Sequence, residues 1–257
     1  MTELTKVLEE VLRLERLGQP GVLVTLIEAG GSTPRHDVAR MVVRADGSSV
    51  GTIGGGTLEH SMAQKALACL TTGQPALEST TLQQLGMPCG GQVKVLLEPV
   101  GLTPWLLIFG AGHVGQEVAL AGERCGFNVA VVDDRPEFAN ESRFPGARQL
   151  VHSFDPVQWD SLSWGTSTYA VVVTRGHEHD YAVVRALVER DLAYLGLMGS
   201  RKKVADARRR LAAEGISAQR IDQLHAPIGL DIASETPAEI AVSILAEVIS
   251  IRRSKEG

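Results

Sequence analysis

The stretch from Trp105 to Asp134 constrains the fold of this chain more than any other segment. It opens with an apolar run that is typical of a buried strand, and then reads Gly-Ala-Gly-His-Val-Gly at positions 110–115. A helical pattern follows, with apolar residues on one face and Gly126 placed to end it. A second apolar run ends at Asp133. This order predicts strand, glycine turn, helix and parallel strand, which is the start of a Rossmann-type domain.

The three glycines of such a turn have separate tasks. Gly110 makes the tight turn, Gly112 lets a phosphate approach the backbone, and Gly115 allows the helix to pack closely on the strand. The free N–H groups at the helix start, where His113 lies, favour an anion. Asp133 stands where a ribose hydroxyl would be held. We therefore treat these five residues as candidate cofactor contacts. Other phosphorylated ligands suit the same turn, and glycines kept for packing alone are the alternative.

Composition excludes several classes of protein. The 257 residues are 44% hydrophobic, enough for a sizeable core and for two domains. A net charge of −5 without a long basic tract argues against a nucleic-acid partner. No apolar run is long enough to cross a membrane, and the charged, amphipathic N-terminus does not resemble a secretory signal. The three scattered cysteines argue against a disulfide framework or structural zinc, and favour a reducing cytoplasm.

A turn-rich segment, residues 98–104, divides the chain. Before it, residues 1–99 predict an α+β domain with about four strands and two helices. We expect the helices at residues 3–17 and 58–70, because apolar residues there recur on one face and a glycine follows each.

Residues 104–257 predict a Rossmann-like domain with a parallel sheet, so the fold class is α/β, with the α+β domain in front. Further strands are expected at residues 169–174 and 193–198. Residues 135–146 have no clean period, and a loop is expected where a crossover helix would usually lie. A closing helix should begin at the capping box of Thr236.

The N-terminal domain contains a second glycine run before a helix. Gly54, Gly55 and Gly56 form a second candidate anion site, and a flexible turn after a hairpin is an equal alternative. Arg35 is a candidate fixed positive charge for a phosphate or carboxylate, with a solvated surface arginine as the alternative.

Cys89 differs from the other two cysteines. It follows Pro88 and precedes two glycines, which is typical of an exposed loop that a ligand can approach. Backbone N–H groups there favour a thiolate, so a reactive or metal-ligating thiol stands against an inert loop cysteine. Cys69 and Cys125 are predicted to be small hydrophobic residues of the core.

His177, Glu178, His179 and Asp180 follow the predicted strand at 169–174. That is the end of the strand at which α/β sheets bind ligands. Imidazole and carboxylate groups also suit zinc or iron. We favour a polar loop that holds a cofactor by hydrogen bonds, with His177 as a contact. The alternative for part of this loop is that it caps the following helix, with Asp180 in the first turn.

Ser200 is expected to cap the next helix, which opens with Arg201 and two lysines. Ser200 and Arg201 are further candidate cofactor contacts. A solvated basic helix face is the alternative for Arg201 and the lysines.

Seven segments, taken together and in order, resemble the XdhC/CoxI family, the accessory proteins of xanthine dehydrogenase and related molybdenum hydroxylases. They are GGSTPR (30–35), GTIGGGTLE (51–59), MPCGG (87–91), FGAGHVG (109–115), VVDDRPEF (131–138), GLMGSRKK (196–203) and HAPIGLDIASETPAEIA (225–241). They cover nearly the whole chain. Many members carry a THxH-like segment after the third Rossmann strand, where this chain has Thr174-Arg-Gly-His177.

The resemblance implies a cofactor chaperone rather than a catalyst. Such a protein would bind molybdenum cofactor, support its sulfuration and insert it into a xanthine dehydrogenase-type hydroxylase. Cys89, as the molybdenum ligand, and Gly54–Gly56 are then the best cofactor contacts. We expect this thiol and the two glycine turns to meet across the interdomain cleft.

The implied partners are the hydroxylase, a cysteine desulfurase and a second copy of the chain in a homodimer. The alternative is an NAD(P)-dependent oxidoreductase that uses the Rossmann half. Asp133 would fit NAD in that case and repel NADP.

Overall fold

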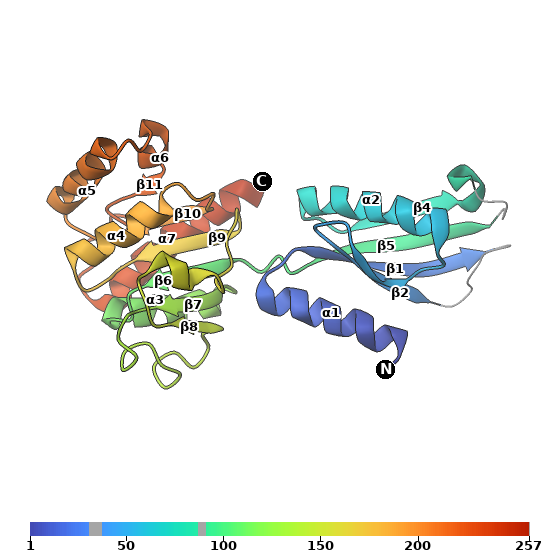
Figure 1. Cartoon of the computed structure of the whole chain (residues 1–257), viewed down its shortest axis with the longest axis horizontal. Coiled ribbons are helices and arrows are strands. Elements are labelled where there is room, and N and C mark those ends of the chain that lie inside the picture. Colours follow the sequence, from blue (N-terminus) through green and yellow to red (C-terminus); the bar gives the residue numbers. More distant parts are fainter. Residues whose placement is uncertain (31–37, 87–90, 257) are drawn as a thin grey trace. The chain divides into compact units, whose positions relative to one another are not determined.

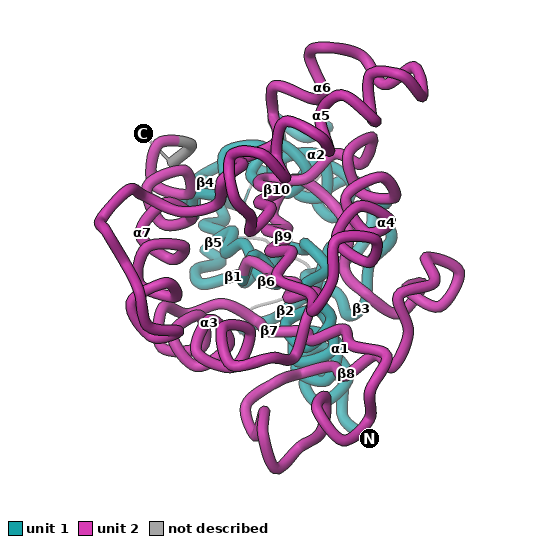
Figure 2. Tube along the Cα trace, turned by 90° about the vertical axis from the view of Figure 1, so that its left-hand side faces the viewer, with its two compact units in different colours: residues 1–103 teal, residues 104–257 magenta. Residues whose placement is uncertain are grey.

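The computed structural model describes residues 1–30, 38–86 and 91–256, apart from the side chains of residues 255 and 256. The chain divides into two compact units, Met1–Thr103 and Pro104–Gly257 (Figure 2). Among the described helices, none combines the length and the apolar character that a membrane span requires. The predicted α/β class is confirmed, with one antiparallel and one parallel sheet.

The first unit is an antiparallel sheet with helices packed on it (Figure 1). Its elements are α1 (Glu3–Leu17), β1 (Gly21–Gly30), β2 (Ala39–Arg44), β3 (Ser49–Thr52), α2 (Gly56–Thr72), β4 (Ala76–Thr81), the 3-10 helix η1 (Leu82–Leu85) and β5 (Gln92–Val100). The strand order across the sheet is β3-β2-β1-β5-β4.

Alternation along β2 separates two apolar clusters on the two faces of this sheet. Met41 and Val43 belong to the larger cluster, which includes the buried face of α2. Val42, between them, packs with Val7 and Leu14 of α1. Both predicted helices are confirmed. The prediction of about four strands missed β3, which is short and carries no large apolar side chain except Val50.

The second unit is a six-stranded parallel sheet with helices on both faces. Its elements are β6 (Trp105–Phe109), α3 (His113–Arg124), β7 (Asn128–Val132), β8 (Gln149–Val151), the 3-10 helix η2 (Pro156–Trp159), β9 (Thr168–Val172), α4 (His177–Leu187), β10 (Tyr194–Leu197), α5 (Arg201–Ala213), α6 (Ala218–Asp222), β11 (Leu224–His225) and α7 (Pro237–Glu256). The strand order is β11-β10-β9-β6-β7-β8.

Every residue of β6, β7 and β9 is buried, because helices cover both faces of the sheet. Helices α3 and α7 lie on one face and α4 and α5 on the other (Figure 2). The chain runs from β6 outwards to β7 and β8, and then returns to place β9 on the other side of β6. The order of the strands therefore reverses between β6 and β9, and ligands bind at the carboxyl ends of strands at such a point.

The predicted Rossmann elements are confirmed. No helix occupies residues 133–148, and the capping box of Thr236 and Glu239 is present. The closing helix begins after this capping box, as predicted, and runs to Glu256. The two shortest strands, β8 and β11, were not predicted, because three and two residues are too few to show a pattern.

The predictions for two of the cysteines had opposite outcomes. Cys69 is buried in the cluster under α2, as predicted. Cys125 is exposed, so its predicted place in the core is wrong. Helix α3 ends at Arg124, and the chain turns at Gly126 with a φ of 80°, so Cys125 lies past the face of the helix that packs on the sheet.

Candidate functional site

The glycine turn after β6 is built from two close backbone contacts. Gly110 has a φ of 122°, and a Cβ there would lie 2.4 Å from the carbonyl oxygen of Val173. A Cβ on Gly115 would lie 1.9 Å from the carbonyl oxygen of Gly110. Both positions therefore need glycine, the first to turn beside β9 and the second to bring α3 onto the turn.

Gly112 has a different surrounding. It is the N-cap of α3 and no side chain caps it, while no described atom lies within 4 Å of the position that a Cβ would take. His113 is exposed at the first helical position. The first N–H groups of α3 are therefore open to an anion that approaches over Gly112.

Asp133 fixes this turn from the end of β7. Its side chain is 1% exposed, and its Oδ2 accepts a hydrogen bond of 2.8 Å from the backbone N–H of Ala111. The Arg135 side chain donates to both carboxylate oxygens, at 2.8 and 2.9 Å, and its backbone N–H donates to Oδ1 at 3.1 Å. The carboxylate is thus shared between the turn and Arg135.

Burial raises the pKa of Asp133, but the hydrogen bonds from Arg135 and Ala111 outweigh it and hold the pKa below its ordinary value. Asp133 is therefore ionised near neutral pH. Its role as a ribose contact stays a prediction, and the carboxylate has almost no exposed surface on which to accept a ribose hydroxyl.

A second ion pair joins the loops on either side of the turn. Arg175, after β9, donates to both oxygens of Asp134, after β7, at 2.6 and 2.8 Å. Because β6 lies between β9 and β7, this pair connects the two strands that flank the glycine turn. The Arg135 guanidinium also stacks 3.8 Å from the centre of the Phe138 ring. Two arginines therefore stand beside the turn.

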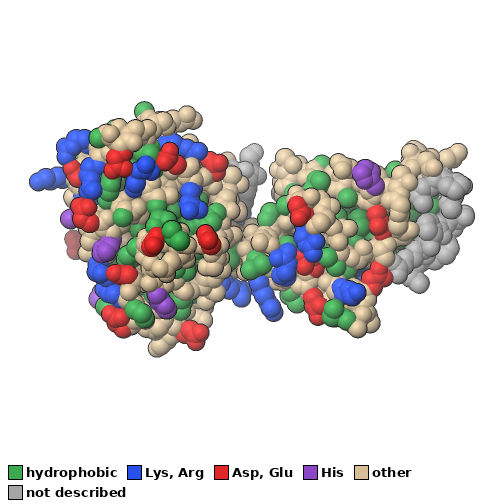
Figure 3. All heavy atoms as spheres, viewed as in Figure 1, with side chains coloured by type: hydrophobic (Ala, Val, Ile, Leu, Met, Phe, Trp, Pro, Cys, Tyr) green, Lys and Arg blue, Asp and Glu red, His purple; other side chains and the backbone are tan. Residues whose placement is uncertain are grey.

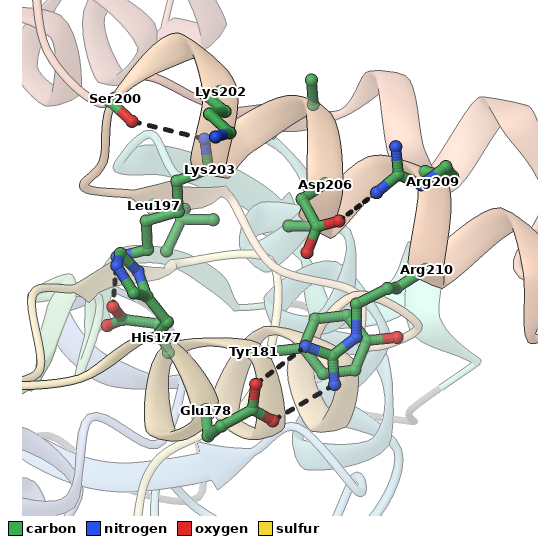
Figure 4. Close-up of a pocket in the computed structure, with 13 residues that line it drawn as sticks. His177, Glu178, Tyr181, Leu197, Ser200, Lys202, Lys203, Asp206, Arg209 and Arg210 are labelled. Atoms are coloured by element: carbon green, nitrogen blue, oxygen red, sulfur yellow. Dashed lines mark hydrogen bonds and ion pairs between the residues drawn. The ribbon is translucent and has the colours of Figure 1, made fainter.

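His177 and Ser200 line a pocket of about 600 Å³ between α4 and α5 (Figure 4). On its inner side Lys203 pairs with Asp180, whose side chain is 2% exposed, and donates to the carbonyl of Met198 at 2.8 Å. Ser200 caps α5 as predicted. Arg201 is exposed at the first position of that helix.

One sequence interpretation of this region needs correction. Lys203 is only 16% exposed, so it is not part of a solvated helix face. Asp180 lies in the first turn of α4, as predicted, and it also accepts hydrogen bonds from the hydroxyl and backbone N–H of Thr174, at 2.7 and 3.0 Å. In the space-filling view, blue side chains gather over α5, which carries six Lys and Arg residues and one acid (Figure 3).

The metal interpretation of residues 177–180 finds no support in the part of the chain that is described. No three His, Cys, Asp or Glu side chains gather there into a metal site. His177 and His179 are two positions apart on a helix and so face different sides. His179 packs 5.2 Å from the Phe154 ring, and Asp180 is engaged by Lys203.

The glycine turn of the first unit already holds a carboxylate. Gly54, Gly55 and Gly56 all have positive φ, at 131°, 83° and 62°. Glu59, in the first turn of α2, accepts hydrogen bonds from the N–H groups of Ile53 and Gly55, at 3.0 and 2.9 Å, and from the hydroxyl of Thr52. The predicted anion site there is filled by the chain itself. Arg35 and Cys89 lie outside the described residues.

Comparison with known proteins decides the family. A model described as the XdhC Rossmann domain matches residues 106–248, and one described as the XdhC and CoxI family matches residues 14–81. The chain belongs to the XdhC/CoxI family. The predicted resemblance is therefore confirmed.

Three relatives are similar over much of this XdhC/CoxI chain. An uncharacterized Escherichia coli protein, YqeB, is 35% identical over 255 residues, 96% of this chain and 46% of its own. A Bacillus subtilis protein, named as a probable subunit of xanthine dehydrogenase, is 32% identical over 67% of this chain and 51% of its own. The molybdenum cofactor insertion chaperone PaoD of Escherichia coli is 25% identical over 93% and 86%.

The chain spans about half the length of the first two of these relatives. A solved structure titled a xanthine dehydrogenase, from Bacillus halodurans, superposes with a TM-score of 0.52 at 24% identity, over 95% of this chain and 96% of the other. That likeness shows the fold of the XdhC/CoxI chain and nothing more.

The structure thus gathers Gly110, Gly112, His113, Gly115 and Asp133 at one end of the XdhC Rossmann sheet. Sequence reasoning missed Arg135 and Arg175 as neighbours of that turn. The VVDDRPEF segment contains Arg135 beside the acid and was one signal for it. Arg175 lies 41 residues after Asp134 in the sequence, and nothing near Arg175 indicated that the two residues pair.

Proposed function

We propose that this protein is an accessory chaperone that binds molybdenum cofactor, supports its sulfuration and inserts it into a xanthine dehydrogenase-type hydroxylase. The observation that carries the proposal is the open turn at Gly112 in a chain of the XdhC/CoxI family. Relatives named for xanthine dehydrogenase and for molybdenum cofactor insertion support it.

The pterin of molybdenum cofactor carries a phosphate, and the turn offers what a phosphate requires. The N–H groups at the start of α3 supply donors and the positive end of the helix dipole. Gly112 leaves the backbone accessible, and Asp133 holds Ala111 in place from below. The chain's own residues would thus bind and orient the phosphate end of the cofactor.

We further propose that Cys89 is the molybdenum ligand and that it holds the metal during sulfuration. A soft thiolate suits this role. Cys89→Ala should lower the amount of cofactor that co-purifies, without a change in melting temperature. Cys125→Ala is the matched control, because Cys125 is exposed at the end of α3. Equal retention by both variants would remove Cys89 from the mechanism.

The remaining contacts and partners are part of the same proposal. Arg35, Gly54–Gly56, His177, Ser200 and Arg201 are proposed secondary cofactor contacts. At Gly54–Gly56 the ligand would have to displace Glu59. The proposed partners are the hydroxylase, a cysteine desulfurase and a second copy of this chain, and the proposed compartment is the cytoplasm.

The NAD(P)-dependent oxidoreductase remains the alternative. The glycine fingerprint is common to both functions. No described feature favours NAD specifically, because the acid expected to hold its ribose is buried and fully engaged.

The test is the state of a hydroxylase made in cells that lack this protein. We expect the enzyme to accumulate with low molybdenum and low sulfide content, and its activity to return with the intact gene. Gly112→Asp should fail to restore it, because a carboxylate at the turn would repel the phosphate. A hydroxylase that is fully loaded without this protein would contradict the proposal.

A further inference from the structure

Two arginines and a backbone N–H surround the Asp133 carboxylate at the mouth of the glycine turn. Arg135 holds both of its oxygens, and Oδ2 also receives the N–H of Ala111. The Nη1 atom of Arg175 lies 4.0 Å from Oδ1. Only the Asp133 carboxylate therefore separates the Arg175 guanidinium from the backbone of the turn.

The two arginines differ in how firmly they are held. Arg135 is 23% exposed, is paired with a buried carboxylate and packs on Phe138. Arg175 is 40% exposed, and its partner Asp134 is 33% exposed. An ion pair open to water contributes less than a buried one, because water and salt weaken the attraction and ordering two long side chains costs entropy. Arg175 is therefore more easily displaced from Asp134 than Arg135 is from the buried Asp133.

The same geometry disfavours a ribose at the end of β7. A ribose diol needs an acceptor carboxylate with open surface. Asp133 is 1% exposed, and each of its oxygens already accepts two hydrogen bonds. Guanidinium groups stand at this place instead, and they match the oxygens of a phosphate.

We propose that a phosphomonoester of the ligand lies between the start of α3 and the end of β7, and that Arg175 exchanges Asp134 for that phosphate. Arg175 is thus a specificity-determining residue, and Asp134 is the anion that occupies it while the site is empty. The inference rests on the proposed function for the pterin ligand. The same chemistry would also recognise the 2′-phosphate of NADP, which distinguishes NADP from NAD.

The test uses two pairs of probes that differ only in a phosphomonoester. One pair is the fluorescent oxidised pterin obtained from molybdenum cofactor, before and after phosphatase treatment. The other pair is NADP⁺ and NAD⁺. Dissociation constants are measured on the full chain by fluorescence or calorimetry. We expect the phosphorylated pterin to bind at least about 10-fold more tightly than its dephosphorylated form, the gain of a charge-assisted hydrogen bond.

Two variants of the ion pair should change that affinity in opposite directions. Arg175→Gln should weaken binding of the phosphorylated pterin about 10- to 100-fold. Asp134→Asn should strengthen it about 2- to 5-fold, because the competing anion is gone. Arg220→Gln is the matched control, since Arg220 pairs with exposed Asp191 at 2.8 Å elsewhere in the unit, and should leave the affinity unchanged. Melting temperatures of the three variants should stay close to that of the unmodified chain.

Each outcome separates the inference from the function on which it rests. If only the NADP⁺/NAD⁺ pair depends on the phosphate and on Arg175, the phosphomonoester site stands and the pterin assignment falls. If neither pair of probes depends on its phosphate, or if Arg175→Gln and Arg220→Gln behave alike with both pairs, the inference is overturned. Restoration of the hydroxylase then still reports on the chaperone function by itself.

Discussion

The two glycine turns of this protein share a sequence signal and differ in what occupies them. Both precede a helix whose N-cap is a glycine with no side-chain cap, Gly55 in the first unit and Gly112 in the second. The fourth residue after the N-cap determines whether the turn is filled. In the first turn this residue is Glu59, and its carboxylate accepts hydrogen bonds from N–H groups of the turn. In the second turn it is Gln116, and its amide forms hydrogen bonds with Arg143 instead.

The comparison teaches that a glycine run before a helix is only half of an anion site. The N–H groups must also be left without an internal acceptor. In the first unit the turn is stabilised by the chain's own carboxylate, which would repel a phosphate. In the second unit the acid of the site, Asp133, is buried and supports the turn by accepting the backbone N–H of Ala111.

The largest expected effect is at the packed glycine of the second turn. In Gly115→Ala, the new Cβ would lie 1.9 Å from the carbonyl oxygen of Gly110, and the turn or α3 must shift. We expect a loss of about 3 kcal/mol in the free energy of unfolding and loss of ligand binding. Urea denaturation measures the first. A stability equal to that of the unmodified chain would show that the close contact is not required.

Removal of the supporting charge should have the next largest effect. Asp133→Asn leaves the partly buried Arg135 without its anion, and we expect a loss of about 2 kcal/mol in unfolding free energy at neutral pH. The pKa of Asp133 is lowered in the folded protein, so its contribution is fully present above the ordinary aspartate value, about 3.9, and is lost as pH falls through the folded value. The difference in unfolding free energy between Asp133→Asn and the unmodified chain should therefore become smaller at acidic pH. A gap that is constant with pH would contradict the assigned role of the charge.

A smaller effect is expected at the filled turn of the first unit. Glu59→Ala removes the acceptor of Ile53 and Gly55, and we expect a loss of about 1 kcal/mol. It also leaves the turn open, as in the second unit, so millimolar inorganic phosphate should raise the melting temperature of this variant. The same phosphate should not act through this turn in the unmodified chain. Absence of any rescue in Glu59→Ala would break the comparison.

The smallest effect on stability is expected at Gly112. With a φ of −70° and no described atom within 4 Å of the added Cβ, Gly112→Ala should change the unfolding free energy by less than about 1 kcal/mol. Affinity for a phosphorylated ligand should nevertheless fall, because the methyl group blocks the closest approach to the backbone. Equal affinities of the two proteins would move the ligand away from this turn.

The sequence predicts those parts of the fold that depend on neighbouring residues. The apolar runs and the glycines of residues 105–133 predict the βαβ start, because strand, turn and helix each have a local pattern. Thr236 and Glu239 likewise predict the start of α7. The short strands β8 and β11 could not be predicted from their own residues, because their positions are set by the neighbouring strands to which they bond.

The site was less predictable, since its contacts join distant parts of the chain. Asp133 was identified by its place after a strand, but its burial depends on Arg135 and Ala111. The pairing of Arg175 with Asp134 exists only because β9 returns beside β6. Glu59 was visible in the sequence, but only the three-dimensional turn shows that it points into the anion site.

Transfer of the cofactor tests the central claim most directly. The purified protein, loaded with molybdenum cofactor, is mixed with a xanthine dehydrogenase-type hydroxylase prepared without cofactor, and molybdenum in the re-isolated hydroxylase is measured together with its activity. We predict that both rise with the loaded protein, and that the Gly112→Ala protein transfers less. No transfer from the loaded protein, or equal loading by free cofactor without it, would contradict the account.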